Sequence, residues 1–172
     1  MSIQSDDRLL AILRSICWVL LVLMMIASAI LLGLAIVLPF MGPGGVEDLK
    51  LGTDPSVRWA VEAMLLLGIV VLLIAMRFMK TLLAIIDTVG EGDPFVPDNA
   101  DRLDGMAWLA TYGFGIALVM ALIAVYVKAR APQAEVNVDL DPGMLFLILV
   151  LFVLARVFRI GSEMRKDLEG TV

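Results

Sequence analysis

Apolar residues occur in four long runs along the chain, separated by short segments rich in charged residues, glycine and proline. A helix needs about 20 apolar residues to cross the ~30 Å hydrocarbon core of a bilayer. The third run is the clearest, because no charged residue occurs between Asp104 and Lys128. The pattern predicts an all-α, polytopic membrane protein, an antiparallel bundle of four transmembrane helices at about 15–38, 58–80, 105–127 and 142–160.

Lysine and arginine in the connecting segments predict the orientation of these spans, because short cytoplasmic loops carry an excess of both. With a cytoplasmic N-terminus, only Lys50, Arg58, Lys128 and Arg130 of the 13 basic residues fall outside. We therefore expect both termini, a loop over 81–104 and a tail over 161–172 to be cytoplasmic. The whole chain, 1–172, is then a single membrane domain.

The second and fourth helices are predicted to continue beyond the membrane. A helix from Arg58 to Val89 would be about 48 Å long, roughly three turns more than the hydrocarbon core requires. Its protruding part is amphipathic, with Met79, Leu82, Leu83 and Ile86 at helical spacing. The tail carries a similar apolar stripe: Leu154, Val157, Phe158, Gly161, Met164 and Leu168. Each extension is expected to pack on another helix, lie on the membrane surface, or offer a face to a soluble partner.

The turn between the second and third spans has its own signals. Gly90 is expected to end the helix in the left-handed cap conformation, and Phe95 to anchor the turn under the bundle. Asp98 or Asn99 is expected to cap the next helix. The neighbouring acids Asp101 and Asp104 are explained by capping and solvation, since the ligand pattern of a calcium loop is missing.

Small residues predict where helices approach closely in lipid. The third span carries Gly113, Ala117 and Ala121 at a spacing of four, and the first carries Ala29 and Gly33. We interpret these stripes as contacts within the chain; a homodimer seam is the alternative.

Composition and charge narrow the functional classes. The chain is 61% hydrophobic, with a mean hydropathy of +0.98, no histidine and one cysteine, Cys17. It carries no nucleophile–base, phosphate-loop or metal-ligand motif, so we expect no enzyme, cofactor or metal site. The net charge of −5 gives no basis for direct nucleic-acid binding.

Two segments carry a resemblance to a known family. They are the turn Gly92-Asp93-Pro94-Phe95, followed by Asn99, Arg102 and Leu103, and the tail from Leu154 to Val172. In these motifs and in its four spans, the chain resembles the bacterial membrane family called domain of unknown function 2975. The resemblance implies a small inner-membrane protein that works beside a short helix-turn-helix DNA-binding regulator.

These observations lead to one principal functional hypothesis. The chain is expected to be a membrane-held regulatory partner of a cytoplasmic protein of the helix-turn-helix type. The expected docking surface or its scaffold comprises Leu82, Ile86, Phe95, Leu103, Met164 and Leu168, with Lys80, Arg102, Arg165 and Lys166 at the rim.

Two alternatives come from other classes. A small transporter, or a lipid- or drug-binding bundle, would need polar groups that converge at mid-membrane, such as Ser28, Thr111 and Tyr112. A structural subunit of a larger membrane complex would be sealed through Gly33 or Gly113.

The orientation gives the first testable prediction. A reporter domain that is active only in the cytoplasm is fused to the N-terminus and, separately, to the C-terminus. Both fusions should be active, because an even number of crossings returns the chain to its starting side. A reporter inserted after Pro132 serves as the matched external control. Termini reported on opposite sides would contradict the four-span topology.

Overall fold

The computed structural model describes residues 3–40, 54–91 and 94–169, and the side chains of residues 8–40, 54–91 and 94–167. The predicted outer loop after Pro39, the motif residues Gly92 and Asp93, and the side chain of Leu168 lie outside these residues. The described part consists of long helices: α1 (Ile3–Val37), α3 (Pro55–Gly90), α4 (Pro97–Arg130) and α5 (Gly143–Glu169), with a short 3-10 turn η1 (Leu38–Phe40) after α1.

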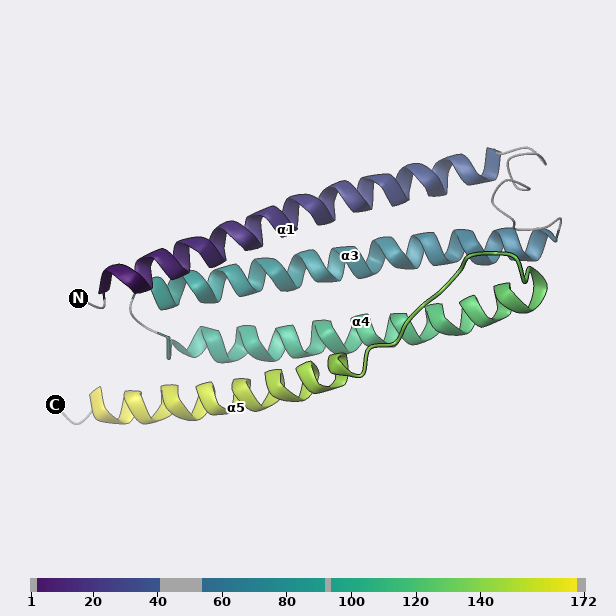
Figure 1. Ribbon diagram of the computed structural model, residues 1–172. Helices are drawn as coiled ribbons and strands as arrows, with labels where there is room; N and C mark the ends of the chain where they lie inside the picture. Colours follow the sequence, from purple (N-terminus) through teal and green to yellow (C-terminus); the bar gives the residue numbers. More distant parts are fainter. Residues whose placement is uncertain (1–2, 41–53, 92–93, 170–172) are drawn as a thin grey trace.

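All four helices are long and apolar enough to cross a membrane, which confirms the predicted all-α, four-helix class of a multi-pass membrane protein. Both termini lie at the same end of the molecule (Figure 1). We call this the proximal end, and the end with η1 and the 131–142 connection the distal end. The sequence predicts that the proximal end is cytoplasmic.

The predicted continuation of the second and fourth helices is present. α3 runs to Gly90 and α5 runs to Glu169 without a break. The sequence missed a third extension, because α1 starts at Ile3, more than ten residues before the apolar run begins. α3 ends at Gly90 and α4 begins at Pro97, so most of the segment 81–104 belongs to helices.

The helices are arranged as a row in chain order, α1–α3–α4–α5, with each helix antiparallel to the next (Figure 1). Extensive contacts join α1 to α3, α3 to α4, and α4 to α5. Within the described residues, α1 and α5 share no comparably extensive contact, so they form the two edges of the row, although Met24 of α1 and Met144 of α5 line one hollow.

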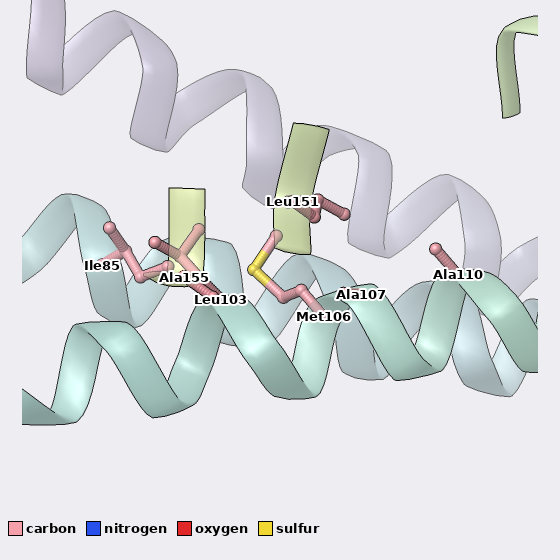
Figure 2. Close-up of a cluster of buried hydrophobic side chains, with 7 residues drawn as sticks. All are labelled: Ile85, Leu103, Met106, Ala107, Ala110, Leu151 and Ala155. Atoms are coloured by element: carbon pink, nitrogen blue, oxygen red, sulfur yellow. The ribbon is translucent and has the colours of Figure 1, made fainter. Parts of the chain in front are cut away.

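The largest buried cluster lies where α3, α4 and α5 meet in the proximal half. It comprises Ile85, Leu103, Met106, Ala107, Ala110, Leu151 and Ala155. The three alanines let the helix backbones approach, and Met106 fills the space beside Leu151 (Figure 2). This is the close packing that holds helices together where lipid is as apolar as the side chains.

A second cluster joins α1 to α3 through Cys17, Leu21 and Leu83, with Met79 and Ile86 packed against it. The amphipathic face predicted on the second helix is thus covered by α1 and by the α4–α5 side. The predicted docking to another helix, rather than to the membrane surface, is the arrangement observed.

Of the predicted small residues, those on the third span face other helices and those on the first span do not. Gly113 is buried, and a Cβ there would lie 3.9 Å from Ile74 on α3. Gly33 and Ala29 are exposed, and a Cβ on Gly33 would meet nothing within 4 Å. α1 approaches α3 instead at Gly68, where a Cβ would lie 3.3 Å from Leu31.

The distal end is closed by a polar latch between α3 and α4. Asp54 caps α3 by accepting a bond of 2.9 Å from the Ser56 amide, and it also accepts one of 3.0 Å from Arg130. The Ser56 hydroxyl, its amide and then Arg130 lower the pKa of Asp54. Because the folded pKa is lowered, this latch contributes stability above the ordinary carboxyl pKa and loses it as the pH falls through the folded value.

Arg58 lies at the same end of the molecule and connects α3 to η1. Glu62 lies at i+4 from Arg58, a spacing at which the two could pair on a helix, but the guanidinium of Arg58 donates to the carbonyl of Leu38 instead. This bond holds η1 against the start of α3, and within the described residues Arg58 and Glu62 form no ion pair.

The buried cluster yields a packing prediction. Ala107 is fully buried, so Ala107→Leu should overpack the α4–α5 contact and lower the free energy of unfolding in detergent by about 1–3 kcal/mol. Ala129, exposed on the same helix, provides the matched control, Ala129→Leu. Equal thermal-unfolding midpoints for the two variants would contradict the packing.

Candidate functional site

Three polar contacts bring the proximal ends of all four helices to one level. Arg14 of α1 pairs with Asp87 of α3 at 3.5 Å. Asn99 of α4 donates to Thr88 of α3 at 2.8 Å. Arg159 of α5 pairs with Asp101 of α4 at 3.2 Å.

These contacts define a polar proximal layer outside the long apolar runs. Asp101 and Arg159 lie close to Asp104 and Arg156, the charged residues that bound the apolar runs of α4 and α5. The layer is therefore built from charged and polar partners, whereas the membrane-depth part of the row is joined by apolar packing.

Asn99 is the centre of this layer and is fully buried. Its amide nitrogen donates to Thr88 Oγ1 and, at 3.0 Å, to the carbonyl oxygen of Pro94. Its Oδ1 accepts a bond of 2.9 Å from Arg102, which also donates to the carbonyl oxygen of Ala84. One side chain thus joins the end of α3, the turn and the first turn of α4.

The capping predictions for this turn are wrong. α4 begins at Pro97 with Val96 as its N-cap, and Val96 makes no side-chain cap bond. The fixed φ of a proline suits the first helical position without a side-chain cap. α3 ends with Glu91 at φ −77°, a right-handed conformation, so Gly90 does not adopt the predicted left-handed one.

Phe95 holds the turn against α5. Its ring centroid lies 5.2 Å from that of Phe158, and a Cβ on Gly161 would come within 2.8 Å of the Phe95 ring. The absence of a side chain at Gly161 therefore makes room for Phe95. The expectation that Phe95 anchors the turn agrees with this contact, although the ring remains partly exposed.

The apolar stripe predicted on the tail is rotated relative to the contact face observed. Ala155 and Ser162 are buried against the rest of the chain, with Phe158 half-buried between them. Val157 and Met164 of the predicted stripe are exposed. A hydrophobicity pattern does not mark Ser162 as a buried position, because serine is polar. Its hydroxyl is satisfied in the buried site, since it donates to the carbonyl of Arg159.

The structure divides the predicted docking residues into two groups. Leu82 and Leu103 pack in the buried clusters, Arg102 is held by Asn99, and Phe95 packs on α5. These residues build the scaffold, and of the four only Phe95 is also exposed. Ile86 is half-buried and lines a cleft, while the other exposed residues are Lys80, Met164, Arg165 and Lys166.

The cleft beside Ile86 lies between the proximal ends of α1 and α3 and has a volume of about 500 Å³. Leu10 and Ile86 supply an apolar floor, and Arg14, Asp87 and Glu91 supply a charged rim; Ala11 and Gly90 complete the lining. Glu91 is exposed, and the Arg14–Asp87 pair is half-exposed and therefore weak.

A wider hollow of about 550 Å³ lies between α3 and α4, with Arg77, Thr81 and Asp98 on its wall. Two of its other lining residues, Arg102 and Asp101, already bind partners within the chain.

A third hollow, about 250 Å³, lies between all four helices and is lined by apolar residues alone, among them Met24, Phe78 and Met144. The polar groups expected for a transporter do not line it. Ser28 and Thr111 donate to carbonyls of their own helices, and Tyr112 is exposed. Among the described residues, no group of three potential metal ligands gathers.

Comparison of the chain with known protein families, with curated proteins and with solved structures finds no match.

Asn99 gives a prediction about the connection between the end of α3 and the start of α4. Asn99→Leu should remove three hydrogen bonds and leave the Pro94 carbonyl and one Arg102 donor without this partner, which lowers the free energy of unfolding by about 2–4 kcal/mol. Asp98→Leu, at the exposed neighbouring position, should change it by less than about 0.5 kcal/mol.

Urea unfolding in mixed micelles measures both variants. Similar losses of unfolding free energy for Asn99→Leu and Asp98→Leu would contradict the conclusion that Asn99 connects α3 to α4. Thr88→Val should show a smaller loss than Asn99→Leu, because it removes only one of the three bonds.

Proposed function

We propose that the chain is a membrane-held regulatory partner of a cytoplasmic protein, which it binds at its proximal end. The observation that supports this most directly is the α1–α3 cleft, with its apolar floor and charged rim. Grooves of this kind accept the apolar face of an amphipathic helix. The cleft also lies beyond the charge-free runs, where a soluble protein has access.

The organisation of the proximal layer also supports binding. Its helix ends are fixed by Asn99, by the Phe95 contact and by the inter-helix ion pairs. A surface on such a scaffold loses little conformational freedom when a partner binds. The described residues offer no comparable constellation for catalysis.

The partner's class comes from the resemblance of the turn and tail motifs. On that basis we propose that the chain resides in a bacterial inner membrane with cytoplasmic termini, and that its partner is a small DNA-binding regulator of the helix-turn-helix type. Binding at the membrane would keep such a regulator away from its DNA sites.

A second candidate function is the binding of an apolar small molecule or lipid chain. The 250 Å³ hollow favours it, because an apolar hollow of this kind stays dry and accepts apolar ligands. Its lining offers no polar side chain for a hydrated solute, so this candidate concerns apolar ligands rather than ion or sugar transport.

The proposed binding function predicts the effect of a charge in the cleft. Ala11→Glu and Ile86→Glu should each weaken binding of the helix-turn-helix regulator by about tenfold or more, because a buried contact loses its apolar surface. The measurement is titration of the regulator onto the full chain in lipid nanodiscs. Ala129→Glu, at the distal end, is the control and should bind normally.

Ala11 is exposed, so Ala11→Glu tests the cleft without disturbing the core. Undiminished binding by both cleft variants would reject the cleft as the docking site. Absence of regulator binding by the unmodified chain, together with stabilisation by an apolar ligand, would favour the second candidate.

A further inference from the structure

The two edges of the row each carry an apolar seam that nothing in the described chain covers. On α1, the seam comprises Leu9, Ile12, Ile16, Val19, Leu23 and Ile26, with side chains between 49% and 60% exposed. On α5, it comprises Phe146, Leu149, Val153, Val157, Ile160 and Met164, between 42% and 71% exposed. Steps of three and four residues alternate along the α1 seam, the repeat of helices that pack by knobs into holes, and the α5 seam uses the same steps with one additional step of four.

Lipid accounts for the membrane-depth part of these seams but not for their proximal parts. Leu9 and Ile12 come before Arg14, whose partner Asp87 lies ten residues beyond Arg77 on α3. Val157, Ile160 and Met164 follow Arg156 on α5. Apolar stripes that continue into the polar layer indicate a protein contact.

The two seams lie at matching levels. The contacts Arg14–Asp87, Asn99–Thr88 and Arg159–Asp101 connect the level of α1 to that of α5 through the row. Measured along the helix axes, Leu9 therefore lies within about one helical turn of the height of Met164, and Ile12 within about one turn of the height of Ile160.

The orientation of the helices also matches. Copies of the chain share one orientation in the membrane, so α1 of one copy would be antiparallel to α5 of the next. Figure 1 shows that every neighbouring pair within the row has this antiparallel relation. A second copy therefore continues the row with the same alternation.

Charges beside the seams distinguish between ways of pairing. Arg8 lies four residues before Ile12, and Glu163 lies three residues after Ile160; both are exposed. At 3.6 residues per turn they fall on the same rotational side of their seams, and equal sides meet when helices pack antiparallel. Pairing α1 with α5 places Arg8 beside Glu163. Two copies of the same helix would be parallel, so Arg8 and its copy, or Glu163 and its copy, would lie on opposite sides of the contact, and neither pairing gains this attraction.

We propose that the chain assembles with copies of itself through the α1 seam of one copy and the α5 seam of the next. The contact joins two different surfaces, so it is heterologous, and repeating it in one membrane plane gives a closed ring where the rotation between copies closes and an open row where it does not. The seams lie away from the α1–α3 cleft, because Leu10, Ala11 and Arg14 line the cleft. The assembly therefore does not depend on the proposed binding function.

Disulfide cross-linking in native membranes tests the contact, in a Cys17→Ser background that removes the only native thiol. Ile12→Cys and Ile160→Cys should each give no cross-link when expressed alone. Co-expressed as two differently tagged chains, they should give a covalent mixed dimer. Both substitutions in one chain should give a ladder of higher oligomers. Ala11→Cys replaces Ile12→Cys in the matched control and should not cross-link to Ile160→Cys.

The charge pair adds a second measurement on the same chains. Arg8→Glu should reduce the mixed dimer by about two- to fivefold, and Glu163→Arg in the other chain should restore it. Cross-linking of either single variant with itself would overturn the heterologous contact in favour of a symmetric dimer. Absence of the mixed dimer would overturn self-assembly through these seams.

Discussion

The structure depends on one constraint: in hydrocarbon, apolar surface does not drive helices together, so other interactions must fix their positions. This chain separates the two tasks along its length. At membrane depth, alanines and Gly113 permit close backbone approach. At the proximal end, where water is available to compete, a fully satisfied Asn99 and inter-helix ion pairs set which residues face one another.

This division explains why the helices form a row. Each polar contact joins helices that are neighbours in the sequence, so nothing in the described layer draws α1 toward α5. α5 also begins late: Met144 and Leu147 line the same hollow as Gly113 and Ala117 of α4. Asp141 completes that start by accepting a bond from the Gly143 amide. On the side where α5 would lie, the distal half of α4 is consequently flanked by the connecting segment 131–142, whereas its other side packs on α3.

The sequence predicted what depends on composition and period. The spans follow from the length of the apolar runs, and the protrusion of α3 follows from counting residues against bilayer thickness. The sequence predicted less well which face of each helix contacts its neighbours. On α5 a stripe through Val157 and Met164 is as apolar as the true face through Ala155 and Ser162. A helix that is apolar on two sides does not reveal which side is occupied within the chain.

Asn99 shows a different limit of sequence reasoning. An asparagine close to a helix start normally indicates a cap, but Pro97 takes over the initiation of α4 and releases Asn99 for tertiary bonds. The signal that could have revealed this is the nearby Arg102, one turn later and on the same face, beside a turn that leaves the Pro94 carbonyl to be satisfied.

The proximal part of α1 illustrates how one short stretch of a helix can take part in several contacts. Successive residues point to different sides: Cys17 packs on α3, Leu10 and Ala11 line the cleft, and Leu9 and Ile12 belong to the outer seam. A ligand in the cleft and a copy on the seam would therefore act on the same rigid element. If one of them binds better in a particular position of α1, the other must respond by the same coupling free energy. The Arg14–Asp87 pair, weak and half-exposed, is the contact that such a displacement would break first.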